Sequence, residues 1–236
     1  MNVFTLIQAW RWALALLLAL SGAAAWAQTV GYVVQLSGTL SVQRADGSTR
    51  ILSLKSAVAA SDTLSTQKDS FATVNFSDGS SATLRPNTSL RVDQYQFDKD
   101  KPQADNFGMR LLKGGLRSVT GLIGKRGNQD AYKIQTNTAT MGIRGSSGDT
   151  LDCSQGCEGV TSRGGGLAHG VYHVTYTGLY IMTTKAGSIL IGPGQFGFAD
   201  DPDKPPVLLE GDPGLGLDPV PFSLGSFDPP QECAVR

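Results

Sequence analysis

The chain has 236 residues, and its 20 lysines and arginines balance its 20 aspartates and glutamates, so the formal net charge is zero. This balance argues against a protein that binds nucleic acid through a basic surface. Eight acidic and two basic residues lie in residues 200–236, which is typical of a solvated acidic tail.

The first 27 residues predict a secretory signal peptide. Arg11 precedes the apolar run Ala13–Leu20, and Ala25-Trp26-Ala27 has the small residues of a cleavage site before Gln28. The apolar run is shorter than the roughly 20 residues needed to cross a bilayer. We therefore expect cleavage after Ala27, a mature chain without a membrane span, and a periplasmic or secreted location.

The mature chain would keep three cysteines, Cys153, Cys157 and Cys233. In an oxidising compartment, neighbouring cysteines usually pair, so the spacing of the first two predicts a Cys153–Cys157 disulfide that clips a surface turn. Cys233 would then stay free or pair with another chain; pairing with one of the other two is the alternative. The sequence does not supply four zinc ligands at a typical spacing.

Nearly the whole chain after Thr29 is expected to form short strands. Alternating β-branched runs meet at Asp46-Gly47 and again at Asp78-Gly79, and Asp-Gly between such runs predicts a β-hairpin. The segment 109–123 has charges at helical spacing, but paired glycines disfavour a helix. It is interpreted as another hairpin, turning at Lys113–Gly115.

Two segments share a nine-residue glycine spacing around an alternating strand, Gly38–Gly47 and Gly178–Gly187. Repeated short β units indicate an all-β fold that grows by stacking, as in a β-solenoid or roll. Nine of the eleven prolines lie from Pro193 onward, and proline is excluded from central strands. The expected organisation is a β domain over 28–192 and a partly ordered, proline-rich acidic tail over 193–236.

Three motifs in this order resemble the FecR protein domain family. They are "ATVNFSDGSSATLRPNTSLRV", "LLKGGLRSVTG" and "YKIQTNTATMGIRG", within a match from Val30 to Leu151. Asn137 stands where the family often has proline, and Ser146 where it usually has threonine. The resemblance implies a β-solenoid-like module.

The family is named for membrane-spanning regulators of iron-uptake sigma factors, which have a cytoplasmic part, one transmembrane helix and a periplasmic sensing region. This sequence resembles only the exported β region. A stand-alone exported member is therefore expected, without the contact to a sigma factor that the cytoplasmic part would make.

The stretch "GIRGSSGD" places Arg144 between Gly142 and Gly145. Its spacing fits neither a phosphate-binding loop nor a nucleophile elbow. With Met141 and Ile143 pointing into the core, Arg144 would point the opposite way and bind carbonyls, Asp149 or Asp152 at a tight corner. We expect Arg144 to be a largely buried structural residue, and Asp78, Gly79, Gly142 and Gly145 to complete the structural motifs.

Tyr172, Tyr176 and Tyr180 recur at every fourth position, and on one strand they would share a face. Such a row is either a half-buried sheet face or a stacking surface for sugar or peptide. His169 and His173 are also four apart, but the sequence adds no ligand between them, so no metal site is predicted.

No catalytic constellation, cofactor motif or metal site stands out. The favoured function is a non-catalytic binding, scaffolding or sensory module in the cell envelope, whose partner is another envelope protein or a polysaccharide. One alternative is an envelope hydrolase, which needs a pocket with at least two of four converging side chains within hydrogen-bond reach: Asp149, Asp152, His169 and His173. Another is signalling through a separate membrane partner.

Overall fold

The computed structural model describes residues 28–128, 130–163 and 165–217. Within these ranges, fifteen strands form one mixed sheet, and the only helical element is the single 3₁₀ turn η1 (Pro102–Ala104). No helix in the described part of the chain has the length and apolar character needed to cross a membrane. The expectation of an all-β fold is confirmed.

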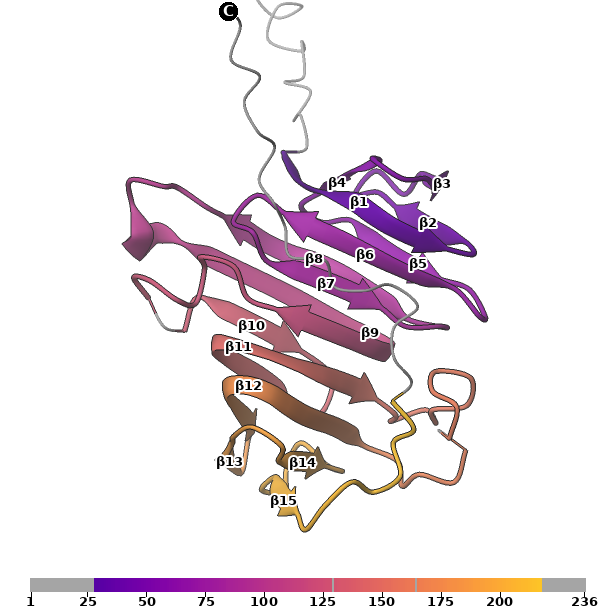
Figure 1. The fold of residues 1–236 in the computed structure, drawn as a ribbon, viewed down its shortest axis with the longest axis vertical. Helices are drawn as coiled ribbons and strands as arrows, with labels where there is room; N and C mark the ends of the chain where they lie inside the picture. The colour runs from indigo at the N-terminus through magenta and orange to yellow at the C-terminus, as the bar shows by residue number, and fades with distance from the viewer. Residues whose placement is uncertain (1–27, 129, 164, 218–236) are drawn as a thin grey trace, which may run out of the picture.

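The strands stack from β1–β4 at the top of Figure 1 to β13–β15 at the bottom. Their bounds are β1 (Thr29–Ser37), β2 (Leu40–Gln43), β3 (Thr49–Leu52), β4 (Ala57–Ala59), β5 (Thr63–Thr66), β6 (Phe71–Phe76), β7 (Ser81–Leu84), β8 (Ser89–Gln96), β9 (Asn106–Val119), β10 (Tyr132–Gln135), β11 (Thr140–Asp152), β12 (Val171–Thr184), β13 (Gly187–Ile191), β14 (Phe196–Ala199) and β15 (Val207–Leu209).

Three long strands, β9, β11 and β12, each divide their pairing between two sets of neighbours. The first half of β9 pairs with β8 and, in parallel, with β10; its second half pairs with β7 and β11. β12 likewise pairs with β14 through its first half and with β13 through its second. The other strand pairs of the described residues are antiparallel. The sheet therefore has two halves that share these long strands.

A glycine with positive φ marks the division in each long strand: Gly114 (φ 90°), Gly145 (φ 63°) and Gly178 (φ 72°). In β9, the buried positions change there from odd-numbered residues such as Leu111 to even-numbered ones such as Leu116. Glycine adopts positive φ without a steric penalty and is the residue of choice at such bulges. The bulge in β9 reverses the alternation, so both halves of this strand turn apolar side chains into the core.

The main core is a large cluster to which both halves of the sheet contribute. It contains Val33 of β1, Val42 of β2, Leu90 of β8, Leu116 of β9 and Tyr180 of β12, all with no exposed surface. Burying such a side chain contributes about 1.5–3 kcal/mol each. Because the cluster joins strands from β1 to β14, it holds the two halves together.

The hairpins at Asp46-Gly47 and Asp78-Gly79 are confirmed: β2 pairs with β3, and β6 with β7, both antiparallel. The hairpin expected at Lys113–Gly115 is wrong, because β9 runs through it without turning. A Cβ at Gly114 would lie 2.6 Å from Thr88 Cα, so the glycine serves a bulge and a close approach.

The described β structure does not stop at residue 192, since β14 and β15 follow it. Whether the whole fold is a solenoid or roll goes beyond what this pairing establishes and stays a prediction. The expected signal peptide, Cys233 and the apolar tail residues Val220, Phe222 and Phe227 lie outside the described residues.

Candidate functional site

Arg144 lies at a corner, but its side chain is not buried. It directly precedes the bulge glycine Gly145, and Met141 and Ile143 point into the core as expected. The Arg144 side chain is 41% exposed, and its ion-pair partner is Asp130, 3.6 Å away, rather than Asp149 or Asp152. The expectation of a largely buried Arg144 is therefore wrong, because the alternation of β11 that turns Met141 and Ile143 inward turns Arg144 toward solvent.

Asp78 and Gly79 form the turn between β6 and β7, and Asp78 binds residues from other parts of the chain. Gly79 takes a φ of 83° in the turn, and the buried Asp78 carboxylate accepts hydrogen bonds from Ser80, from the Tyr95 hydroxyl and from the Ile123 amide. Burial and the charge of Asp78 together raise the pKa of Tyr95 well above its ordinary value. This turn thus fixes the segment that follows β9.

The three tyrosines do not share one face of β12. Tyr172 is buried in a small second cluster, Tyr176 is 40% exposed, and Tyr180 lies in the main core. Gly178 lies between the last two and changes the phase of the strand. Of the three expected contact residues, only Tyr176 is substantially accessible.

Tyr176 belongs to a buried ionic network around Asp149, which has no exposed surface. Asp149 accepts hydrogen bonds from Arg85 at 2.6 Å, from Arg117 at 2.8 and 3.0 Å, and from the Tyr176 hydroxyl at 3.0 Å. The Arg117 guanidinium also stacks over the Tyr176 ring, 4.8 Å from its centroid. These contacts tie four strand segments together.

The electrostatics of this network are those of a satisfied ion cluster. Burial would raise the pKa of Asp149, but the hydrogen bonds and charges of Arg117 and Arg85 outweigh it and hold the pKa below its ordinary value. Burial and the Asp149 charge raise the pKa of Tyr176 to about 12. A carboxylate held ionised between two guanidiniums has no proton to give and is poorly placed to accept one.

The four side chains of the hydrolase alternative do not converge. His173 is buried on the core side, where its Nδ1 lies 3.0 Å from Thr150 Oγ1 and its ring packs on Tyr180. Burial lowers its pKa to about 3, only partly offset by the charge of Asp149. Asp149 faces the opposite side of the sheet, and His169 is exposed in the loop before β12.

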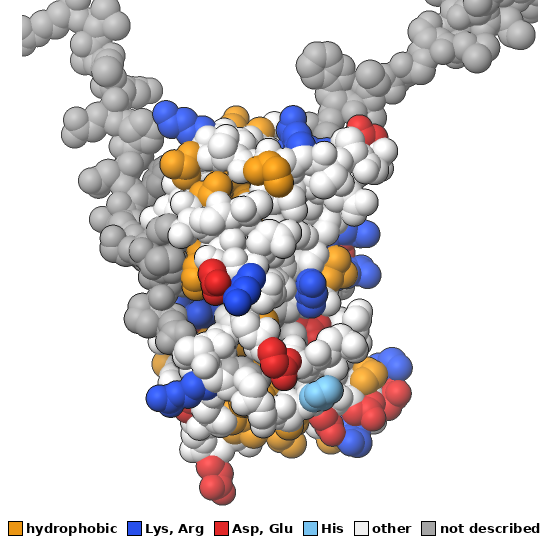
Figure 2. Space-filling model, turned by 90° about the vertical axis from the view of Figure 1, so that its right-hand side faces the viewer, with side chains coloured by type: hydrophobic (Ala, Val, Ile, Leu, Met, Phe, Trp, Pro, Cys, Tyr) orange, Lys and Arg blue, Asp and Glu red, His pale blue; other side chains and the backbone are white. Residues whose placement is uncertain are grey.

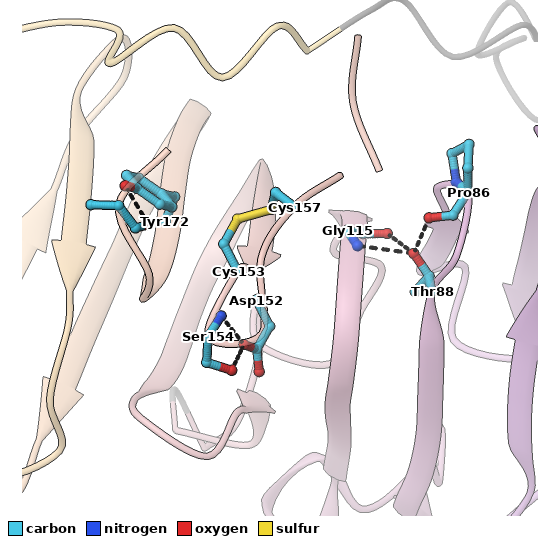
Figure 3. The surroundings of a disulfide bond; sticks show 9 residues. Pro86, Thr88, Gly115, Asp152, Cys153, Ser154, Cys157 and Tyr172 are labelled. Carbon is cyan, nitrogen blue, oxygen red and sulfur yellow. Dashed lines mark hydrogen bonds between the residues drawn. A yellow bond between two sulfur atoms is a disulfide. The ribbon is translucent and has the colours of Figure 1, made fainter. Parts of the chain in front are cut away.

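No three histidine, cysteine, aspartate or glutamate side chains form a metal-binding group in the described part of the chain. The Cys153–Cys157 disulfide is present, as expected. Both cysteines are buried, however, and they pack with Tyr172 and Leu215 in the second cluster. Figure 3 shows the disulfide beside Asp152, whose carboxylate accepts two hydrogen bonds from Ser154.

A polar groove of about 480 Å³ crosses the solvent-facing side of β8, β9 and β10, and we name it the β8–β10 groove. It combines three cations, one carboxylate, three side-chain amides and a glycine. These are Arg91, Arg110, Lys133, Asp93, Gln94, Asn106, Gln135 and Gly108. Among the described residues, no apolar side chain lines it.

Strand register explains how the charges gather in the groove. Arg91 and Arg110 are direct cross-strand partners, and like charges so placed destabilise a sheet. A register shift between Val92 and Gln94 brings Asp93 to the arginines, and its carboxylate accepts hydrogen bonds from both Nε atoms. The bulge therefore supplies the carboxylate that lets two arginines stand side by side.

Lys133 carries an uncompensated charge. It lies between Gly108 of β9 and Gly142 of β11 in a row across the sheet. The Lys133 ammonium has no ion pair within the described residues. Because both cross-strand neighbours of Lys133 are glycines, no side chain of theirs packs against the lysine.

Neither glycine is required by the fold. A Cβ at Gly108 would meet Gln94 at 3.7 Å, and one at Gly142 would meet Ile181 at 3.9 Å, both ordinary contacts. Neither residue has a positive φ. Glycine in a strand interior costs about 0.5–1 kcal/mol and often marks close approach by a ligand. Because glycine has no side chain, the sheet surface on both sides of Lys133 is open, and we call this surface the open floor of the groove.

Another hollow lies beside Arg44, and its lining also includes Arg50, which has no ion pair within the described residues. The hollow beside Arg44 has a volume of about 530 Å³, but Arg44 there binds Asp62 and the carbonyl of Ala57. On the face drawn in Figure 2, acidic, basic and hydrophobic side chains are interspersed. The β8–β10 groove differs in gathering three cations in one lining, with a glycine on each side of Lys133, and we take it as the candidate binding site.

Sequence reasoning missed this groove. Arg91, Arg110 and Lys133 each lie between two buried residues of their own strand, so the alternation marks them as outward-facing. The pairing of β9 with β10 is parallel and could not be read from that alternation.

Comparison with known proteins gives a family for the middle of the chain. Residues 62–163 match the family described as FecR protein, so the match begins later and ends later than the expected range of 30–151. No curated protein sequence matches the chain.

Several solved structures are similar in part. A cell surface anchoring domain shares 24% identity over 26% of this chain and 82% of its own, with a TM-score of 0.26. Two structures of a candidate anti-sigma factor from Parabacteroides distasonis share 12% identity, with TM-scores of 0.45 and 0.46. In both, the match covers 64% of this chain and 60% of the other. The family match confirms the FecR resemblance expected from the sequence motifs, and we call the matching residues 62–163 the FecR region.

Proposed function

We propose that this chain is a non-catalytic binding module of the cell envelope, and that it holds its ligand in the β8–β10 groove. The observation that carries the proposal is the open floor around Lys133, an unpaired cation between two glycines that the fold does not need. The groove lies within the FecR region, residues 62–163.

A binding role fits the chemistry of the groove better than a catalytic one. Its one carboxylate, Asp93, is held by two arginines, so it is not set up as a general base. Arginine, lysine and amide side chains instead donate hydrogen bonds to an anionic or hydroxyl-rich ligand. Export through residues 1–27 is part of the same proposal, and an intact mass that begins at Gln28 would support it.

The proposal is tested in the organism of origin by replacing the gene with groove variants. A strain with Gly108→Val should show the phenotype of the deletion strain at unchanged protein level, because the added side chain fills the groove floor. Lys68→Gln, which removes an exposed lysine outside the groove, is the matched control and should behave as wild type. A Gly108→Val strain indistinguishable from wild type, beside a deletion strain with a phenotype, would contradict the proposal.

The FecR region favours a sensory output as the second candidate. In that case, the filled groove would change signalling through a separate membrane partner. Transcript profiles of the deletion and Gly108→Val strains should then share a set of altered genes. Phenotypes confined to the envelope, with unchanged transcripts, would favour scaffolding.

A further inference from the structure

We propose that the ligand of the β8–β10 groove is an acidic polysaccharide that carries carboxylate groups on repeating sugar units. This inference rests on the proposed function and names the ligand class of that same site.

The positions of the cations suit a ligand with more than one negative charge. Arg91 and Arg110 lie in one cross-strand row, and Lys133 lies in the next row, two residues along the strands. Two residues span roughly 7 Å. A chain with repeated carboxylates can place one negative charge on each row, so it can contact all three cations along the groove.

The arginines keep donors for such a ligand. Both bind Asp93 through Nε, and Arg110 Nη2 makes only a long 3.4 Å contact with Gln135. The Arg91 side chain is 48% exposed and the Arg110 side chain 43%. Their terminal nitrogens can therefore form paired hydrogen bonds with a carboxylate.

The amides suit the hydroxyl groups of a sugar. Asn106 donates a hydrogen bond to Gln94 at 2.9 Å, which fixes both side chains at the groove wall. Each retains further donor or acceptor capacity, and Gln135 lies across the groove from them. Amide groups donate and accept, as sugar hydroxyls do, so they can bind the units between carboxylates.

A peptide ligand fits the groove less well. β9 and β10 are each paired on both sides, and β8 is paired with β9 along the groove and with β5 at Ser89–Arg91, so the two strands of the groove floor offer no free edge for an added peptide strand. A protein partner would also need an apolar anchor, and no apolar side chain lines the groove. Single-stranded nucleic acid would need aromatic platforms, which the lining also lacks.

Binding of the purified full chain should be measured by calorimetry with four probes: alginate, polygalacturonate, carboxyl-reduced polygalacturonate and poly-L-glutamate. We expect binding to at least one of the two acidic polysaccharides, weakened severalfold between 50 and 300 mM salt because the contacts are ionic. Carboxyl-reduced polygalacturonate keeps the hydroxyls but not the charges and should not bind. Poly-L-glutamate should bind at least tenfold more weakly.

Variants place the binding in the groove. Lys133→Gln should weaken it at least tenfold, Gly108→Val should abolish it with an unchanged or higher Tm, and Lys68→Gln should leave it unchanged. The inference is overturned if neither acidic polysaccharide binds, if the reduced polymer or poly-L-glutamate binds as tightly, or if Lys133→Gln has no effect. Should these assays fail while Gly108→Val still reproduces the deletion phenotype, the ligand class is wrong and the groove function stands.

Discussion

Arg85 and Asp149 form a hydrogen-bonded ion pair of 2.6 Å in which both side chains are almost completely buried, with 1% and 0% exposure. They are 64 residues apart in sequence and join the end of β7 to β11. A buried pair of this kind adds little net stability relative to an apolar pair, but it becomes costly once one partner is removed. The pair therefore specifies how these two segments pack.

Asp149→Asn should destabilise the protein by about 3–5 kcal/mol, because two buried guanidiniums lose their shared counter-charge. Chemical denaturation with the linear extrapolation measures the change. Asp130→Asn removes an exposed carboxylate and is the matched control, with an expected change within about 0.5 kcal/mol. Equal stability of the two variants would show that the Asp149 network is not what holds these strands.

Arg144→Ala should change the free energy of unfolding by no more than about 0.5 kcal/mol, because its ion pair with Asp130 is exposed at both ends. Arg85→Ala, at the buried arginine, should cost several times more. Thermal denaturation of both variants and the wild type, under the same conditions, measures the two changes in Tm. A fall of several degrees for Arg144→Ala would restore the sequence-based interpretation of a buried corner arginine.

The contrast between these arginines shows what the sequence could predict. The turn dipeptides and the local disulfide act over a few residues, so Asp46-Gly47, Asp78-Gly79 and Cys153–Cys157 could be predicted correctly. The change of phase at a bulge glycine could not, because a turn and a bulge use the same residue. That is why Gly114 was expected in a hairpin.

Long-range contacts could not be predicted from the sequence because they depend on which strands pair and in which register. Asp149 was expected near Arg144, five residues away, whereas its partner Arg117 is its cross-strand neighbour on β9. The groove likewise depends on which strands pair, since Lys133 meets Gly108 only through the parallel β9–β10 pairing. Outward-facing charges can be recognised from alternation alone, but their assembly into one site requires the register.

Stability should fall as the solution is made acidic, first because of His173. The pKa of this buried histidine is about 3 in the folded state and 6.5 in the unfolded state. Below pH 6.5 the unfolded chain binds a proton that the folded chain does not, so stability is lost between pH 6.5 and about 3. The expected slope is about 1.4 kcal/mol per pH unit in this window.

His173→Gln should flatten this slope, whereas His169→Gln, at an exposed position, should retain it. Below about pH 3.9 the protonation of Asp149 adds a second loss, because its folded pKa is held below that of the unfolded chain. Denaturation midpoints measured from pH 7 to pH 3 separate the two windows. A His173→Gln variant with the wild-type slope would be inconsistent with a buried neutral histidine.

Replacing both Cys153 and Cys157 with alanine should lower the free energy of unfolding. Loss of the loop closure alone should account for about 2 kcal/mol, the contribution expected for so short a loop. The loss adds to that of the packing in the second cluster, where both cysteines lie against Tyr172 and Leu215. Denaturation with and without a reducing agent gives the disulfide contribution in the wild-type chain. Reduction without any loss of stability would contradict it.

Gly108→Ala should leave the fold intact and raise its stability by about 0.4–1 kcal/mol, because the new Cβ meets nothing closer than 3.7 Å and restricts the unfolded chain. Gly148→Ala is the contrasting substitution, since its Cβ would lie 2.5 Å from the Val174 carbonyl oxygen and 2.9 Å from the His173 ring. Backbone atoms on a paired strand cannot move aside cheaply, so we expect a loss of several kcal/mol there. Thermal and chemical denaturation of both variants measure the difference. A stable Gly148→Ala, or a Gly108→Ala that unfolds, would contradict the strand register described above. Gly108 would then be needed by the fold, and its lack of a side chain would no longer indicate a ligand.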